Sequence, residues 1–162
     1  MVFKVKPIGV IKTPFKMTDK IPIQASKSAV AAEVEVFPEY SEGLDSLDGF
    51  SHVYLLYWFH KAQPPKMKVK PFLDTQERGL FSTRAPSRPN PIGFSVVKII
   101  AIEENILRFE GADMLNDTPL IDIKPFVPRF DNRLEATSGW LDKSPSAKNH
   151  DYRGDDRFID SR

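Results

Sequence analysis

Two arginines, Arg84 and Arg88, lie within a proline-rich segment that spans residues 81–95, and a guanidinium group can bind a carboxylate or a phosphate. The three prolines of this segment fix their own φ angles and keep the preceding residues out of the helical region. We therefore expect an extended, polyproline-like path whose backbone groups are free for a ligand or a partner strand. At ~3.1 Å per residue, the two arginines would stand roughly 12 Å apart, enough to serve two different charged groups. A structural loop with solvated arginines is the alternative.

Positive charge is concentrated around these arginines, in residues 61–91. This part carries seven Lys and Arg residues and two acidic residues, although the whole chain has a net charge of only +1. One basic segment on an otherwise acidic protein suggests a localised anionic partner. The alternative is a lysine-rich surface loop that its charges keep soluble.

Three further polar positions are candidates for ligand contacts. His60 ends an apolar run, at the point where a core strand would reach solvent, although it could equally be a strand-end histidine bonded to a neighbouring loop. Residues 116–118 (Asn-Asp-Thr) precede a proline and lie between two predicted strands, a pattern typical of a plain turn. Gln24 stands at the end of a loop braced by prolines.

Several kinds of chemistry are excluded by composition. The chain has no cysteine, which rules out disulfides, thiolate zinc sites and cysteine nucleophiles and favours a reducing cytosol. Its eight glycines never form a dinucleotide or Walker loop. His52 and His60 would lie roughly 26 Å apart on one straight strand, so we expect no metal site. The apolar run at residues 53–59 is too short to cross a membrane and no signal-peptide core precedes it, so we expect a cytoplasmic protein.

The elements that must position these residues are predicted to be mostly strands. Residues 31–36 alternate with period two, and residues 53–59 are apolar on both faces. The predicted strands are 3–6, 8–11, 31–36, 53–59, 95–102, 106–110 and 120–124, with a hairpin turn at 103–105. Short helices are expected near 40–47 and 66–73, because fourteen prolines leave little room for long ones. This pattern predicts a mainly β chain, either a barrel or a sandwich.

Domain organisation is expected to be simple. Residues 1–142 form one domain, and residues 143–162 are a polar tail with few large apolar side chains. Such a segment cannot bury enough surface to offset its ordering entropy, so we expect the tail to be mobile.

The central motifs resemble those of a known family. FSTRAPSRPNPIGFSVV, with GFSHVYLLYWFH before it and GADMLNDTPLIDIKPFVP after it, is similar to the TsaA-like (TrmO) tRNA methyltransferases, and IGVIKTPFK and SGW fit the same pattern. The resemblance covers roughly residues 8–141. It implies a single antiparallel β-barrel with a few short helices, unlike the Rossmann-like sheet of most methyltransferases. It also implies a homodimer that uses S-adenosylmethionine to methylate N6 of threonylcarbamoyl-adenosine beside the anticodon of tRNA.

The resemblance also implies a cofactor site, although the match is not complete. Ile23 replaces the usual arginine of a Pro-Arg-Gln motif, Phe94 stands where leucine is commoner, and the usual DGTP turn reads NDTP here. The larger bacterial members carry a further C-terminal domain. The implied cofactor-binding positions are Pro22, Ile23, Gln24, His60, Lys61, Arg84, Phe94, Asn116, Asp117 and Thr118.

The reaction itself suggests further roles. The attacking nitrogen bears a proton and is delocalised into a carbonyl, so a base should help, and His60 and Asp117 are the candidates. RNA phosphates would be bound by Lys66, Lys68, Lys70 and Arg88. Two alternatives stay open: an S-adenosylmethionine-dependent methyltransferase with another substrate, and a non-catalytic RNA-binding barrel.

Overall fold

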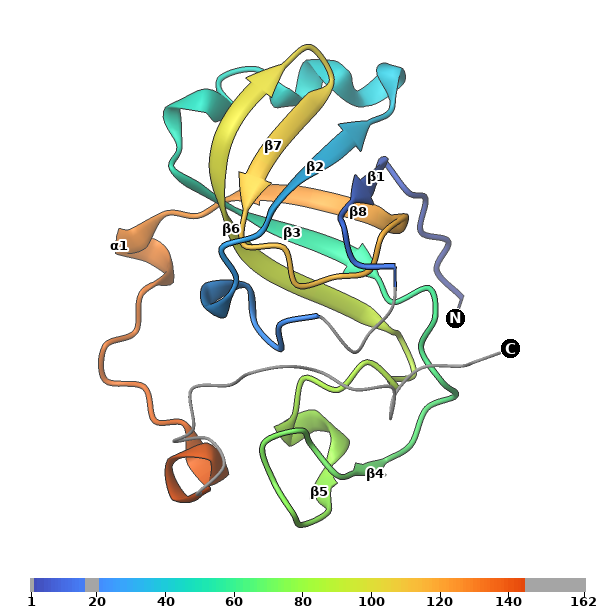
Figure 1. The fold of residues 1–162 in the computed structure, drawn as a ribbon, viewed down its shortest axis with the longest axis vertical. Helices are drawn as coiled ribbons and strands as arrows, with labels where there is room; N and C mark the ends of the chain where they lie inside the picture. Colours follow the sequence, from blue (N-terminus) through green and yellow to red (C-terminus); the bar gives the residue numbers. More distant parts are fainter. Residues whose placement is uncertain (1, 17–20, 145–162) are drawn as a thin grey trace.

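The computed structural model describes residues 2–16 and 21–144, and its centre is a closed barrel of six antiparallel strands (Figure 1). The strand order around the barrel is β1-β2-β7-β6-β3-β8, so every barrel strand has two neighbours. The barrel strands are β1 (Gly9–Lys12), β2 (Ala31–Val36), β3 (His52–Trp58), β6 (Ile92–Glu103), β7 (Ile106–Glu110) and β8 (Thr118–Pro125). The predicted mainly β fold with a single antiparallel barrel is confirmed.

The barrel interior is filled by side chains that alternate along each strand. In β2 the buried residues are Ala32, Val34 and Val36, as the period-two pattern predicts. Strand β3 alternates too, with Leu55 fully buried and its outer face only partly covered. Phe109 of β7 is also fully buried. Because these inward-facing side chains are buried, the interior is a packed core rather than a channel. Burying a side chain of this size stabilises the fold by about 1.5–3 kcal/mol.

The longest strand, β6, connects the core to the region of interest. It begins at Ile92, three residues before the predicted start, and its pairing with β7 shifts register between Ile99 and Ala101. A bulge of this kind bends a strand, which helps a sheet to close. The predicted hairpin between β6 and β7 is confirmed, and Glu104 turns the chain there with φ of 54°.

Outside the barrel lies a smaller unit that we call the extension, residues 66–90. It contains a two-stranded sheet, β4 (Lys68–Val69) with β5 (Arg78–Gly79), followed by the 3-10 helix η5 (Leu80–Ser82). Its own apolar cluster consists of Val69, Leu80 and Ala85, with Phe72 packed against it. Figure 1 shows the extension below the barrel, with the 3-10 helix η6 (Gly139–Lys143) beside it. The remaining short helices are η2 (Ala25–Lys27), η3 (Pro38–Leu44), η4 (Leu47–Gly49) and α1 (Pro128–Asp131).

Three local predictions need comment. Residues 3–6 form no strand, and the first strand, β1, begins only after Pro7, which cannot donate a ladder hydrogen bond. No helix forms at 66–73: β4 lies there instead, with a proline shortly after it. The helical prediction near 40–47 is confirmed as η3 and η4, although both are 3-10 helices.

Most of the predicted tail, residues 145–162, lies outside the described residues, and Lys143 belongs to η6. Among the helices of the described residues, none is long and apolar enough to cross a lipid bilayer.

Candidate functional site

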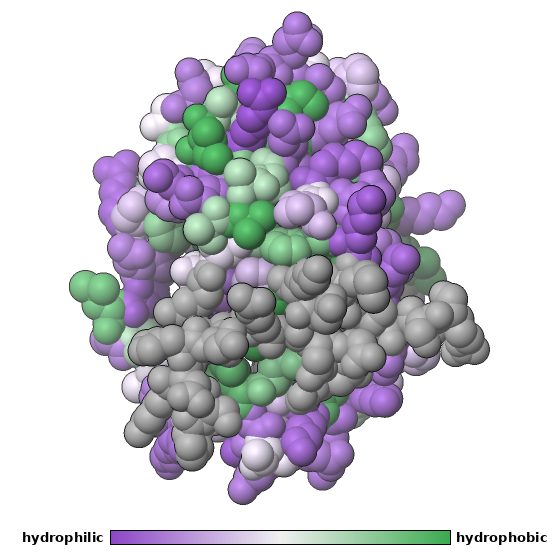
Figure 2. Space-filling model, viewed as in Figure 1, coloured by the Kyte–Doolittle hydropathy of each residue, from purple (hydrophilic) through white to green (hydrophobic). Residues whose placement is uncertain are grey.

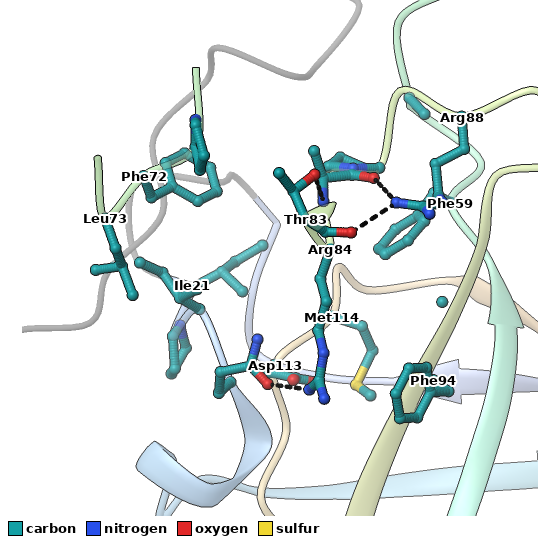
Figure 3. Close-up of a pocket in the computed structure, with 18 of the residues that line it drawn as sticks. Ile21, Phe59, Phe72, Leu73, Thr83, Arg84, Arg88, Phe94, Asp113 and Met114 are labelled. Atoms are coloured by element: carbon teal, nitrogen blue, oxygen red, sulfur yellow. Dashed lines mark hydrogen bonds between the residues drawn. The ribbon is translucent and has the colours of Figure 1, made fainter. Parts of the chain in front are cut away.

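A cavity of about 1110 Å³ lies between the extension and the barrel end where β3 stops and β6 begins (Figure 3). Barrel residues form one wall, while the extension and η6 form the other. In Figure 2, hydrophobic side chains reach the surface between these two parts of the molecule. Many predicted site residues line the cavity: Pro22, Ile23, Gln24, His60, Lys61, Arg84, Arg88, Phe94 and Thr118.

Arg84 is the central cation of this cavity. Its guanidinium donates a hydrogen bond of 2.7 Å to Gln24 Oε1 and lies 4.9 Å from the ring centroid of Phe94. Figure 3 shows the Arg84 side chain reaching down beside Met114 toward Asp113. Three predicted residues, Gln24, Arg84 and Phe94, are therefore in one cluster although they come from three separate parts of the chain. The remaining N–H groups of the arginine are oriented in a cavity large enough for a ligand.

Arg88 has a different environment. Its guanidinium donates to the carbonyl oxygens of Thr83 (3.0 Å) and Ala85 (3.2 Å), as the dashed lines of Figure 3 show. Its backbone N–H donates to Pro86 O at 2.8 Å. The loop is thus folded on itself by Arg88, and the prediction of an extended path with free backbone groups is wrong for this part. The prolines restrict φ, but the Nη1 group of Arg88 satisfies two of the carbonyl groups that such a path leaves open.

An acidic residue that sequence reasoning did not select, Asp113, also lines the cavity. Ser95 Oγ donates to Asp113 Oδ1 at 2.6 Å, and the Tyr57 hydroxyl lies 3.1 Å from the same Ser95 oxygen. The backbone N–H of Ala25 donates to this carboxylate as well. Burial raises the pKa of Asp113 to about 7, against the opposing effects of the Ser95 hydrogen bond and of Arg84. Asp113 can therefore gain or lose a proton near neutral pH.

The buried Tyr57 explains why a glycine follows the proline loop. A Cβ atom on Gly93 would stand 2.3 Å from Tyr57 Cε2 and 2.8 Å from Phe59 Cζ. The Tyr57 and Phe59 rings pack edge to face at 5.3 Å. Burial also holds the pKa of Tyr57 well above its ordinary value, so its hydroxyl stays protonated and donates to Ser95.

His60 and Asp117 stand in different positions relative to the cavity. His60 is partly buried and lines it, and burial together with Lys61 lowers the pKa of His60. Asp117 is exposed, does not line it, and is bonded to Lys12 at 2.5 Å, an interaction that lowers the pKa of Asp117. The two groups still interact electrostatically, because Asp117 acts to raise the pKa of His60.

The turn at residues 116–118 is held from several sides. Asn116 accepts from the Thr13 backbone N–H at 3.0 Å and donates to Asp117 Oδ2 at 2.8 Å. Asp117 adopts a left-handed conformation, with φ of 61°. Thr118 is buried and lines the cavity, whereas Asn116 does not line it. The plain turn that the sequence predicts is therefore present, with one of its members at the site.

The remaining predicted residues lie elsewhere. Lys66, Lys68 and Lys70 are exposed on the extension and do not line the cavity. Among the described residues, no three His, Asp or Glu side chains are grouped closely enough to hold a metal ion. The site residues missed from the sequence are Asp113, Met114 and the aromatic side chains Phe72, Phe81 and Trp140. Spacing carries no signal for them, because they lie in loops or short 3-10 helices that only the folded chain brings to the cavity.

Comparison with known proteins agrees with the resemblance of the motifs. A model of the tRNA-methyltransferase O N-terminal domain matches residues 10–132. A probable S-adenosyl-L-methionine-binding protein of Pyrococcus abyssi is 48% identical over 155 residues, covering 95% of this chain and 84% of the relative. The tRNA (adenine(37)-N6)-methyltransferase of Homo sapiens is 33% identical over 135 residues, 78% of this chain and 31% of the human protein. The crystal structure of TrmO from Pseudomonas aeruginosa matches with a TM-score of 0.76 and 38% identity, over 90% of this chain and 65% of that one.

Proposed function

The chain belongs to the tRNA-methyltransferase O (TrmO) family, and from this premise we propose that it is an S-adenosylmethionine-dependent methyltransferase. Its proposed substrate is N6 of threonylcarbamoyl-adenosine beside the anticodon of tRNA. The name of the human relative, a methyltransferase of adenine 37 in tRNA, supports this substrate. One structural observation carries the proposal: Arg84, Gln24 and Asp113 meet in a cavity whose other walls are largely apolar.

The residues of the cavity fit this cofactor chemically. S-adenosylmethionine carries a carboxylate, an ammonium group, a sulfonium cation and an apolar nucleoside face. Arg84 would bind the carboxylate, since guanidinium and carboxylate form strong charge-assisted hydrogen bonds. The Asp113 carboxylate would balance positive charge, and bound cation would in turn favour its ionised form. The other residues proposed to hold the cofactor are Pro22, Ile23, Gln24, His60, Lys61, Phe94 and Thr118. Asn116 and Asp117 would contribute by fixing the turn that carries Thr118.

A proton must leave the attacking nitrogen, and His60 is the proposed acceptor. Its lowered pKa keeps the imidazole neutral at pH 7. One ring N–H donates to the backbone at Trp58, which leaves the lone pair of the other ring nitrogen to accept a proton. Asp117 would stabilise the imidazolium that forms, through the same charge interaction that raises the pKa of His60. The bound cofactor supplies an electrophilic methyl group, so orientation of the two reactants accounts for much of the remaining rate.

RNA binding is proposed to use the extension. Lys66, Lys68 and Lys70 are exposed there, where they can approach phosphates without entering the cavity. Arg88 would add positive charge close to the cavity entrance, although two of its hydrogen bonds already go to the loop. A homodimer is proposed on the resemblance to the family alone.

Calorimetric titration with S-adenosylmethionine tests the cofactor site directly. We expect micromolar binding to the wild-type protein and its loss in Arg84→Ala. Arg129→Ala is the matched control, because Arg129 also lies over an aromatic ring, Phe130, at 5.0 Å, but does not line the cavity. Equal loss in both variants would contradict the assignment of the site.

Methyl transfer to tRNA that bears threonylcarbamoyl-adenosine then tests the reaction. Cofactor binding without this activity would favour a methyltransferase with another substrate. RNA binding without cofactor binding would favour a non-catalytic barrel and would overturn the proposal.

A further inference from the structure

We propose that the cavity contains a second compartment, formed by Phe81 and Trp140, that binds an unpaired purine base of an RNA substrate by stacking. This inference rests on the proposed function and deepens it, because it assigns the nucleobase subsite rather than the cofactor subsite. Both side chains line the cavity, Phe81 from the extension and Trp140 from η6.

The size of the cavity is the first argument. Sites for one drug-sized ligand span roughly 300–1,000 Å³. The cavity here measures about 1110 Å³, which is above the upper end of this range and gives room for more than one ligand of ordinary size. Arg84, Gln24 and Asp113 gather at one place in this cavity, and the extension and η6 add the aromatic side chains Phe72, Phe81 and Trp140 to its lining.

Trp140 is held in a fixed position on that second wall. Its indole N–H donates to the carbonyl oxygen of Ser82 at 2.8 Å, and the Arg78 guanidinium lies 5.4 Å from its ring centroid. The Ser144 hydroxyl also donates to the Leu73 carbonyl oxygen, which attaches the segment after η6 to the extension. A ring held in this way loses little conformational entropy when a base stacks on it.

Phe81 is unusually exposed for an apolar residue. Its exposed fraction is 77%, although it lines the cavity and lies one residue before Ser82, the acceptor for Trp140. The Arg88 guanidinium lies 5.7 Å from the Phe81 ring. Two aromatic rings, each accompanied by an arginine, therefore line one cavity. Stacking of bases on aromatic side chains with arginine nearby is how proteins bind single-stranded nucleic acid.

The charge around the compartment favours a nucleotide over an uncharged apolar ligand. Arg78 and Arg88 stand at the two rings, and three exposed lysines lie on the same extension. Asp74 pairs with Arg78 at 2.7 Å and keeps that arginine in place. A base stacked on these rings would leave its phosphates near the cations, and an unpaired base is required because its faces must be free.

Fluorescence of Trp140 provides the test. The chain has two tryptophans, so Trp58→Phe leaves Trp140 as the single reporter. We would titrate this variant with the nucleoside N6-threonylcarbamoyl-adenosine, first alone and then with the protein saturated by S-adenosylhomocysteine. The expected result is quenching by the nucleoside in both titrations.

Phe81→Ala should weaken nucleoside binding by about fivefold or more, since stacking contributes about 1–3 kcal/mol per base. Phe130→Ala is the matched control, because Phe130 is 60% exposed with Arg129 over its ring but does not line the cavity. If Trp58→Phe does not fold, calorimetry of Phe81→Ala in the wild-type background makes the same comparison. An equal effect of the two substitutions would overturn the proposal.

The cofactor's own adenine is the competing occupant. Quenching by S-adenosylhomocysteine that excludes the nucleoside would show that the compartment holds that adenine, and would overturn the inference. Because the titrations measure binding and not turnover, they separate this inference from the proposed function. Nucleoside binding without methyl transfer would support the compartment and contradict the enzyme. Methyl transfer without quenching of Trp140 by the nucleoside would support the enzyme and contradict the compartment.

Discussion

Arg84 and Gln24 are joined by a hydrogen bond of 2.7 Å, although sixty residues separate them in the chain. The bond links the loop before η2 to the extension across the cavity. Among the described residues, no ion pair or hydrogen bond joins the arginine to an acidic side chain, although Asp113 interacts with it electrostatically. A neutral partner orients the guanidinium without neutralising it.

Gln24→Glu should therefore weaken cofactor binding more than Gln24→Ala. The new carboxylate would pair with Arg84 and compete with the carboxylate of the ligand, so we expect a loss of about tenfold or more, consistent with about 1.5–3 kcal/mol for charged hydrogen bonds. Calorimetric titration with S-adenosylmethionine measures the difference. Equal affinity of the two variants would show that Arg84 does not bind an anionic group of the cofactor.

Asp113 should make the stability of the protein depend on pH. Its pKa is raised from 3.8 to about 7 by burial, so the folded protein holds this proton more tightly than the unfolded chain. The stabilisation that comes from this proton is fully present below the pKa of Asp113 in the unfolded chain. It is lost as the pH rises from about 4 to about 7, so the free energy of unfolding falls across this window. Urea denaturation at several pH values checks it, and Asp113→Asn should remove this component.

Ser95→Ala provides a directional control for that experiment. The Ser95 hydrogen bond lowers the pKa of Asp113, so its removal should move the upper end of the window to higher pH. A downward movement would contradict the assigned hydrogen bond.

His60 should respond in opposite directions to two neighbouring substitutions. Lys61 lowers the pKa of His60 and Asp117 raises it. Lys61→Gln should therefore shift the imidazole titration upward, and Asp117→Asn should shift it downward. NMR titration of the His60 ring protons measures both, and shifts of the same sign would contradict the electrostatic model.

Under the proposed mechanism the rate of methyl transfer should rise with pH through the midpoint of the His60 titration, because only neutral imidazole accepts a proton. If Asp117→Ala kept full turnover and normal cofactor affinity, Asp117 would have no part in catalysis.

Gly93→Ala should destabilise the protein although alanine is the smallest possible replacement. The added methyl group would meet the Tyr57 and Phe59 rings at 2.3–2.8 Å, and overpacking of this kind costs about 1–3 kcal/mol. Gly43→Ala is the control, because nothing lies within 4 Å of its added Cβ. Urea denaturation compares the two variants. A similar free energy of unfolding for both would mean that the aromatic pair moves aside without cost.

RNA affinity should depend on salt through the extension. Each phosphate contact contributes about 0.7 to the slope of log affinity against log salt for single strands and about 0.9 for duplexes. Replacing Lys66, Lys68 and Lys70 by alanine should make this slope shallower by about two to three. Lys98→Ala, in the middle of β6 and outside the cavity lining, should leave the slope unchanged. If the affinity of the wild-type protein does not change with salt, these lysines do not bind phosphates.

The strands could be predicted from the sequence wherever one face is buried. Ala32, Val34 and Val36 alternate with charged or exposed residues, and these three are the residues of β2 that face the barrel interior. Phe3 and Val5 alternate in the same way but remain exposed, and residues 3–6 pair with no strand. Pairing partners are a property of the whole fold and leave no local pattern.

The candidate site could be predicted only in part, for a related reason. Arg84 and Gln24 could be selected because they lie in motifs that resemble those of the family. The spacing of residues alone does not place the two side chains in one site. Asp113 reads as an ordinary polar residue next to a turn, and only folding places it beside Ser95 in a cavity that raises its pKa. Arg88 looks like a ligand-binding cation, yet its nearest acceptors are two carbonyl groups of its own loop.

Closure of the barrel also constrains how the protein can be made. Gly9 of β1 pairs with Leu120 of β8, so one edge of the first barrel strand stays unpaired until the last barrel strand has been made. During synthesis, a ribosome must deliver more than a hundred residues before this pairing is possible, and such long-range pairing slows folding. Until then the nascent chain exposes unpaired strand edges that can join to other chains. Translation speed and chaperone supply should therefore affect the yield of this protein more strongly than its size suggests.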